Sequence, residues 1–174
     1  LRRDIKLNFH SPNALNARFV TRDLAELMVR AGFKTFYLGF ESASLQWQKR
    51  TGSKVFSDEL AQAVECLISA VHRMPYVSAE PASITAYQIL GHPHIDIQQL
   101  EASMHFISSL GIRGMLADFS PIPGTPDGEY CRRWVDMDEP LMHNKTAFPI
   151  ILLGFDETNR LKDLQRQLNR SVPH

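Results

Sequence analysis

The stretch Lys34–Ser42 reads KTFYLGFES and decides the fold class. Its apolar and its more polar side chains alternate. The first set is Phe36, Leu38 and Phe40, and the second is Thr35, Tyr37, Gly39 and Glu41. A period of two over such a run predicts a β-strand with one buried face. A carboxylate at the end of a buried strand is costly unless it has a partner, so Glu41 is the first residue that needs an explanation.

A strand–helix rhythm extends from this stretch in both directions. Further strands are predicted at residues 4–10, 84–90 and 112–120, and helices at 21–31, 44–50, 57–73, 96–110 and 156–170. Strict alternation predicts parallel βα units in an α/β fold. Four such units make half of an eight-stranded barrel, and a doubly wound sheet is the other arrangement. We predict the barrel part at residues 1–134 and a tail with a C-terminal helix at residues 135–174.

Composition excludes several classes of function. The chain has 174 residues, with 19 basic side chains against 19 acidic ones, so net charge gives no case for nucleic acid or an anionic membrane. No apolar run approaches the roughly 20 residues that span a bilayer. Cys66 and Cys131 are far apart and suggest neither a disulfide framework nor a metal cluster. No secretory signal is visible, and we expect a cytoplasmic location.

Polar side chains gather at the carboxyl ends of three predicted strands. They are Asn8 and His10, Tyr37 and Glu41, and Asp118 and Ser120. Ligands bind at this end of parallel strands in barrels and in open α/β sheets. If the polar faces point inward, these side chains converge on one cavity. The alternative is that each one caps the adjacent loop or helix.

The turn Gly91-His92-Pro93-His94 raises the question of a metal site. Two imidazoles do not make a site without a third ligand, which His10 or Asp118 could supply. A metal-dependent hydrolase that uses these four His and Asp side chains is therefore a second hypothesis. The proline and the turn-rich context favour an ordinary turn, so we assign no metal ligand.

Three strand ends together resemble those of radical S-adenosylmethionine (SAM) enzymes. Residues 39–42 (GFES), 90–93 (LGHP) and 120–126 (SPIPGTP) resemble the ends of the fourth, fifth and sixth barrel strands. Residues 8–15 (NFHSPNAL), followed by Ala17-Arg18, look like the third strand and its loop. Residues 139–144 (EPLMHN) look like the tail of members that often carry an N-terminal cobalamin-binding domain. The resemblance covers nearly the whole chain.

This resemblance implies a partial (βα)6 barrel, of which the chain would hold the third to sixth βα units. The family binds SAM and a [4Fe-4S] cluster, takes an electron from a donor, and produces a 5′-deoxyadenosyl radical that abstracts hydrogen from a substrate. Cobalamin would be a further cofactor of the full-length protein. The substrate, a small molecule or a macromolecule, is not readable from the sequence.

Site residues can be carried over from the family by position. Glu41 and Ser42 match the contact to the ribose or methionine part of SAM. Gly91 and Pro93 match the fifth-strand region near the adenine, and the main chain of Ser120, Pro121 and Ile122 matches the sixth-strand edge. Asn8, His10, Tyr37 and Asp118 are the candidates for the substrate-binding lumen.

The chain also departs from the family pattern. The Cys-x3-Cys-x2-Cys cluster loop and the second-strand motif that binds the SAM amino group are absent. His92-Pro93-His94 stands where the family usually has Leu-Pro-Gly. We therefore expect the chain alone to be inactive. A non-catalytic barrel remnant that serves as a binding module is a third hypothesis.

Overall fold

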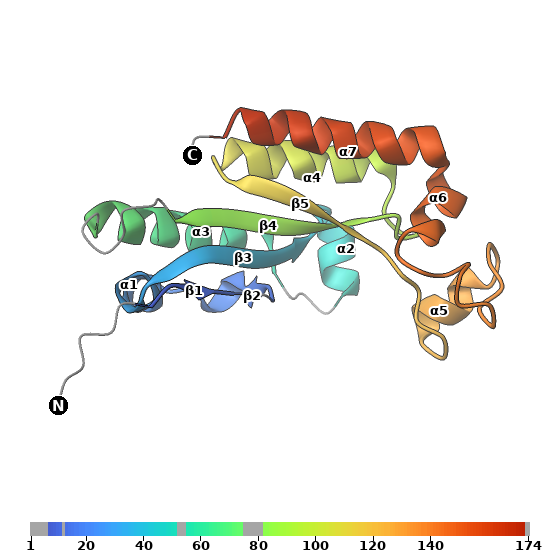
Figure 1. Ribbon diagram of the computed structural model, residues 1–174, viewed down its shortest axis with the longest axis horizontal. Coiled ribbons are helices and arrows are strands. Elements are labelled where there is room, and N and C mark those ends of the chain that lie inside the picture. Colours follow the sequence, from blue (N-terminus) through green and yellow to red (C-terminus); the bar gives the residue numbers. More distant parts are fainter. Residues whose placement is uncertain (1–6, 12, 52–54, 75–81, 173–174) are drawn as a thin grey trace.

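The protein is a mixed α/β structure built on a parallel half-barrel sheet (Figure 1). The computed structural model describes residues 7–11, 13–51, 55–74 and 82–172. The strands are β1 (Phe9–His10), β2 (Leu15–Asn16), β3 (Phe33–Glu41), β4 (Ser83–Leu90) and β5 (Arg113–Asp118). Their order is β1-β3-β4-β5, with β2 also pairing with β3, and every pair is parallel. The predicted α/β class is confirmed.

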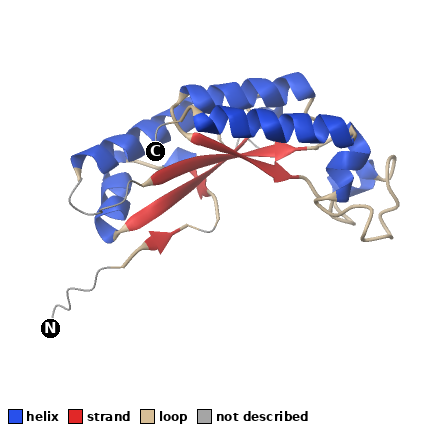
Figure 2. Ribbon diagram, turned by 45° about the horizontal axis from the view of Figure 1, so that its top comes forward, coloured by secondary structure: helices blue, strands red, loops and turns tan. Residues whose placement is uncertain are grey.

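Helices connect the strands and cover one face of the sheet (Figures 1 and 2). They are η1 (Ala17–Phe19), α1 (Arg22–Ala31), α2 (Leu45–Arg50), α3 (Ser57–Arg73), α4 (Ile97–Ser109), α5 (Pro126–Cys131), α6 (Ala147–Leu153) and α7 (Phe155–Arg170). The long helices α1, α3, α4 and α7 pack against the sheet, whereas α2 and α5 lie beyond the carboxyl ends of its strands. The face opposite the long helices is the open face.

The alternation predicted for β3 is confirmed. Phe36, Leu38 and Phe40 are buried, with exposed fractions of 0%, 0% and 2%, and they pack in one core with Leu60 and Leu67 of α3. The intervening side chains are half-buried and lie on the open face. One strand therefore carries core side chains on one face and the half-buried, more polar side chains on the other.

One predicted strand is shorter in the structure, and one predicted helix has an unusual cap. The strand predicted at residues 4–10 is formed only at Phe9–His10 in the described part, and residues 4–6 lie outside it. The helix predicted at residues 57–73 is present as α3, and its N-cap is Phe56, whose amide donates to Glu59 Oε2 at 2.7 Å. Glu59 thus supplies the cap from within the helix.

The last helix, α7, belongs to the layer that covers the sheet. It packs against β5 and α4. Asn169 of α7 donates to the Gly114 carbonyl and accepts from the Gly114 amide, both at 2.9 Å. A Cβ at Gly114 would lie 2.5 Å from Nε2 of Gln165, so a larger residue there would displace the Gln165 side chain. The division of the chain at residue 134 stays a prediction, but α7 is not detached from the sheet.

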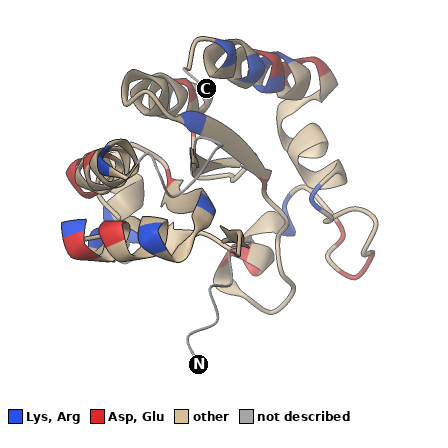
Figure 3. Cartoon of the chain, turned by 60° about the vertical axis from the view of Figure 1, so that its left-hand side comes forward, with Lys and Arg blue, Asp and Glu red and all other residues tan. Residues whose placement is uncertain are grey.

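Charged side chains lie mainly on the helices and loops (Figure 3). The strand β4 has none, and β3 and β5 carry theirs near their ends. In the described part of the chain, no helix combines the length and the apolar character needed to cross a membrane.

Candidate functional site at the carboxyl edge of the sheet

Glu41, the last residue of β3, is the centre of a strained turn. The Ser42 amide donates to the Phe40 carbonyl at 2.9 Å, which closes a three-residue turn, and φ of Glu41 is +69°. This conformation is rare for a residue with a side chain and costs on the order of 1–3 kcal/mol. The turn shifts the β3–β4 register between Gly39 and Glu41. Such strain is concentrated at binding sites, which makes this turn a candidate for function.

An indole ring holds the Glu41 side chain at this edge. Nε1 of Trp47 on α2 donates to Glu41 Oε2 at 3.2 Å. The ring is only 5% exposed, and Ser44 caps α2 by accepting the Trp47 amide. The direction of the carboxylate is therefore set by a rigid helix next to the strand end.

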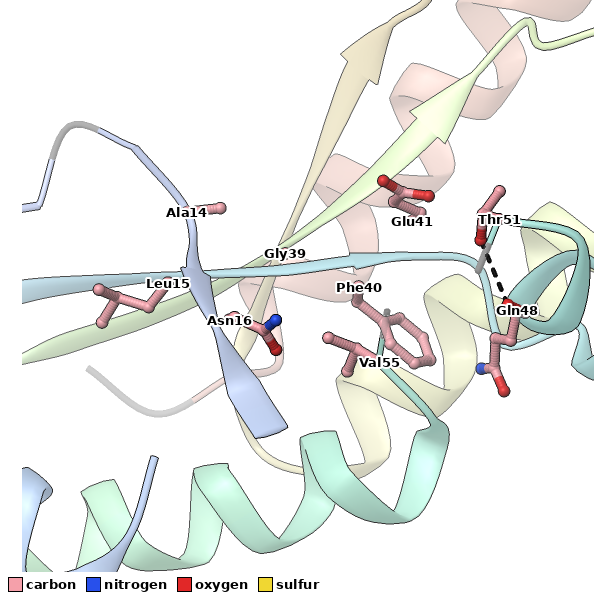
Figure 4. A pocket seen from close by; sticks show the side chains of 9 residues that line it. All are labelled: Ala14, Leu15, Asn16, Gly39, Phe40, Glu41, Gln48, Thr51 and Val55. Carbon is pink, nitrogen blue, oxygen red and sulfur yellow. Dashed lines mark hydrogen bonds between the residues drawn. The ribbon is translucent and has the colours of Figure 1, made fainter. Parts of the chain in front are cut away.

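A hollow of about 150 Å³ opens beside the turn (Figure 4). Its lining comes from β2, β3, α2 and the segment before α3, and consists of Ala14, Leu15, Asn16, Gly39, Phe40, Glu41, Gln48, Thr51 and Val55. In Figure 4, Glu41 and Phe40 point to opposite sides of β3. A volume of this order accommodates one small ring.

Ser42 has a structural task. Its hydroxyl is fully buried, lies 3.4 Å from Ser103 Oγ, and accepts the Ser44 amide at 3.1 Å. Ser103 of α4 also accepts the Ala43 amide at 2.7 Å. The two serines anchor the β3–α2 turn on α4. A contact of Ser42 with a cofactor would therefore have to use the main chain.

A pair of tyrosines lies on the open face. The rings of Tyr37 and Tyr87 are 5.3 Å apart and inclined by 27°. Burial, and next the neighbouring Tyr37, raise the pKa of Tyr87 above its ordinary value. Met115 of β5 is in register with Tyr87 and is 41% exposed. The pair and Met115 form an uncharged surface, and the predicted role of Tyr37 toward a substrate stays a prediction.

The two candidates from the first strand lie at its exposed edge. His10 Nδ1 is 3.2 Å from Thr35 Oγ1, so this ring lies on the same face as Tyr37. Asn8 precedes β1 and is exposed. Neither residue approaches the Glu41 turn through a described contact.

His92 is buried as a neutral imidazole. Its Nδ1 accepts the His94 amide at 3.2 Å, which leaves the proton on Nε2, 3.5 Å from Asp127 Oδ2. The rings of Trp47 and Phe119 pack on it at 4.5 and 4.3 Å. Burial lowers the pKa of His92 to about 4, although Asp127 acts in the opposite direction.

Gly91 is required by packing. Its φ is +81°, and a Cβ there would lie 2.8 Å from Pro149 of α6. Pro93 is half-buried in the turn that follows. These contacts explain the residue types without a ligand, so the predicted adenine contacts stay predictions.

The third predicted strand end runs along the loop after β5. Ser120 Oγ donates to the His143 carbonyl at 2.9 Å, which ties this loop to the segment before α6. Pro121 is fully buried, whereas Ile122 is 64% exposed. Of the three carried-over residues, Ile122 alone presents its side chain to solvent.

The expected position of Asp118 in the lumen is wrong. Leu116, two residues earlier, packs in the core beneath α4 and α7, and Asp118 lies on the same helix-covered face. Its Oδ2 accepts from Lys162 Nζ of α7 at 2.9 Å. The polar character of Asp118 thus serves an ion pair with a helix and not the face that carries Tyr37.

The four side chains of the metal-hydrolase hypothesis are not brought together. Among the residues that the structure describes, no group of three or more His, Cys, Asp or Glu side chains is placed to hold a metal. Asp118 lies on the helix-covered face, and Nδ1 of His92 already accepts the amide of His94.

Four further residues of this edge were not predicted from the sequence, and only one of them has a sequence signal. Tyr87 occupies the same alternating position in its strand as Tyr37 does, so it could have been found. Trp47 and Tyr130 come from the short helices α2 and α5, and Arg133 comes from the turn after α5; only packing brings these three to the strand ends.

The chain was compared with protein-family models and with curated proteins. No family model matches it, and no curated protein matches it significantly.

Proposed function

We propose that this chain is the third-to-sixth βα part of the (βα)6 partial barrel of a radical SAM enzyme of the cobalamin-associated type. The observation that carries the proposal is the strained Glu41 turn at the carboxyl edge of a parallel sheet. A carboxylate held there by Trp47 can accept the two hydroxyls of a ribose. The adjacent hollow has the size of one small ring.

The exposed edge of β1 supports the proposal as well. Leu24 and Leu27 of α1 are 40% and 58% exposed. They lie on the side away from α3, because Glu26 of the same helix pairs with Arg73 of α3 at 3.0 Å. An apolar helix side beside an edge strand is what a barrel lacking its first two βα units would leave uncovered.

The described residues could hold SAM but not the iron–sulfur cluster. Glu41 would hold the ribose, with main-chain groups near Ile122 toward the adenine, and the chemistry that bound SAM supplies is hydrogen abstraction from a substrate. A [4Fe-4S] cluster does not fit. Burial raises the pKa of the Cys131 thiol to about 11, and Cys66 is half-buried on another helix. The proposal therefore places the cluster ligands outside this chain, together with any cobalamin site.

The coding sequence upstream of Leu1 is the first test. We expect it to encode a Cys-x3-Cys-x2-Cys motif. An in-frame start near Leu1 would instead support a binding module. A second overturning result would be that this isolated chain, reconstituted anaerobically with iron and sulfide, assembles a cluster and cleaves SAM.

A variant of the longer protein tests the role of Glu41. We expect Glu41→Gln to bind SAM about ten-fold more weakly. The glutamine amide has one acceptor oxygen, whereas the carboxylate has two and can accept both ribose hydroxyls. Equilibrium dialysis with labelled SAM measures this. Glu65→Gln, an exposed change on α3, is the matched control. Equal affinities of the two variants would contradict the assignment.

A further inference from the structure

An arginine that is held by an aromatic ring lies at the same edge of the molecule. The Arg133 guanidinium carbon is 4.2 Å from the centroid of the Tyr130 ring. The ring packs in turn on His94, at 4.4 Å, and on Trp134, at 5.4 Å. These contacts place Arg133 next to the turn after β4, beyond the carboxyl ends of the strands.

Arg133 differs from the preceding arginine in its partners. Arg132 is neutralised by Glu129 at 2.7 Å and by Asp138 at 3.5 Å. In the described part of the chain, no carboxylate lies within ion-pair distance of Arg133. Stacking on a ring uses the face of a guanidinium and leaves its N–H donors at the rim of the plane. Among the described residues, Arg133 is therefore a donor that an aromatic ring holds in place and that has no carboxylate partner.

A second arginine adds positive charge to this place. Arg50, at the end of α2, is exposed and likewise has no ion-pair partner among the described residues. Burial first, then the charge of Arg50 and more weakly that of Arg133, lower the pKa of His94. Asp127 is the opposing charge here, and it faces the buried His92 ring. Trp47, one turn before Arg50 on α2, packs on the His92 ring at 4.5 Å, and the rings of His92 and His94 are 5.5 Å apart, so the end of α2 lies near the turn that Tyr130 contacts.

We propose that Arg133, positioned by Tyr130, and Arg50 form a receptor for an oxyanion, the carboxylate or phosphate group of a ligand. The planar fork of a guanidinium matches both groups, and charge-assisted hydrogen bonds to them are about twice as strong as neutral ones. Trp134, which is 38% exposed, flanks the receptor and offers apolar surface to the rest of the ligand. The receptor is independent of the proposed SAM chemistry, because it uses residues that no cluster or SAM contact requires.

The test is a titration of the chain, without SAM or cluster, with inorganic phosphate and separately with acetate at constant ionic strength. The arginine Nε–Hε signals in ¹H–¹⁵N spectra report binding, and Arg133→Lys identifies the Arg133 signal. We expect a saturable shift of that signal with at least one of the two anions. Phosphate alone would indicate a phosphate-bearing ligand, and acetate alone a carboxylate. No saturable shift with either anion would overturn the proposal.

Variants separate positioning from charge. We expect binding to weaken about ten-fold in Arg133→Gln and about three-fold in both Arg50→Gln and Tyr130→Leu. Arg133→Lys keeps the charge but loses the fork, so its affinity should lie between those of the wild type and Arg133→Gln. Arg30→Gln removes the same charge at the last turn of α1, next to the amino end of β3, and should change binding less than two-fold. Equal effects of Arg133→Gln and Arg30→Gln would leave only non-specific charge and would overturn the receptor.

Discussion

Two residues at the carboxyl edge of the sheet, Glu41 and His92, are held in states that cost free energy. Glu41 has φ of +69° in a three-residue turn, and His92 is buried at 2% exposure. Trp47 contacts both, through a hydrogen bond to the carboxylate and a ring contact to the imidazole. At this site, one indole ring therefore joins a glutamate with a strained main chain to a neutral imidazole.

Strain at Glu41 predicts that glycine is more stabilising than glutamine at this position, the reverse of the order expected within a helix. Glu41→Gly should be more stable than Glu41→Gln by about 1 kcal/mol, because glycine adopts a positive φ without a steric penalty. Urea unfolding measures the difference. At Glu65, within α3, the order should reverse by about the same amount, because glycine is a poor helix former. If glycine is the less stable variant at both positions, the turn is not strained.

Burial of His92 predicts that the protein loses stability in mild acid. Its pKa is about 4 in the folded state and 6.5 in the unfolded chain, so the unfolded chain takes up the proton first. The free energy of unfolding should therefore be constant above about pH 6.5 and fall by roughly 3 kcal/mol toward pH 4. Urea unfolding at pH 7.5 and pH 5 measures the fall.

Two histidine variants serve as controls for this pH dependence. His92→Gln should flatten it, whereas His105→Gln, an exposed change on α4, should keep it. Burial also lowers the pKa of His94, which leaves a smaller residual slope of the same sign. An unchanged slope in His92→Gln would show that His92 is not the group responsible.

Among the elements of the fold, helix α7 covers part of one edge of the sheet. Asn169 hydrogen-bonds the amide and the carbonyl of Gly114, as a neighbouring strand would. Gln165 donates to Asn169 and accepts from the fully buried Gln88 of β4. A polar chain thus runs from the sheet into the helix, and it covers the outer edge of β5 at this point.

Loss of this edge contact should be costly. We expect Asn169→Ala to lower the free energy of unfolding by about 1–3 kcal/mol, because two main-chain groups at the edge and the Gln165 amide lose their partner. Thermal and urea unfolding measure the loss. Asn159→Ala, an exposed change on the same helix, should stay within about 0.5 kcal/mol of the wild type. Equal effects of the two changes would exclude a role of Asn169 at the edge.

In the whole molecule, the two edges of the sheet differ in how far they are covered. A half barrel has two sheet edges, and an exposed edge is an aggregation risk. In the structure, α7 covers part of the β5 edge, whereas the β1 edge lies beside exposed apolar side chains. These are Leu7, Phe9, Phe19, Leu24 and Leu27, with exposed fractions between 40% and 65%. One edge of the sheet is thus partly covered by a helix, and the other lies beside exposed apolar side chains.

This asymmetry predicts self-association through the β1 side. The double change Leu24→Glu and Leu27→Glu should shift the chain toward monomer without lowering its free energy of unfolding, because both side chains are already exposed. Sedimentation velocity over a range of concentrations measures the shift. Ile151→Glu, at 41% exposure on α6, is the control and should leave association unchanged. Association that is equal in the double variant and the wild type would contradict the prediction.

Local pattern explains which parts of the site could be predicted. The alternation in KTFYLGFES places Phe36 in the core and Tyr37 on the open face, as the structure has them. The same reasoning fails for Asp118, because polarity alone does not distinguish an open face from a helix-covered face that holds an ion pair with Lys162. Residue size is no better a guide in α1, which exposes Leu24 and Leu27 and buries the smaller Ala25 and Val29.

The sequence by itself determined the parallel α/β class, the position of the main strand and the helix ends at Thr21, Ser44 and Asp96, because these depend on neighbours within a few residues. Tertiary structure alone decided what meets at the carboxyl edge. Trp47 reaches Glu41, Tyr130 packs on His94 and holds Arg133, and Asn169 pairs with Gly114 only after the units have packed. Contacts of this kind depend on the relative placement of whole elements, which the pattern along one segment does not encode.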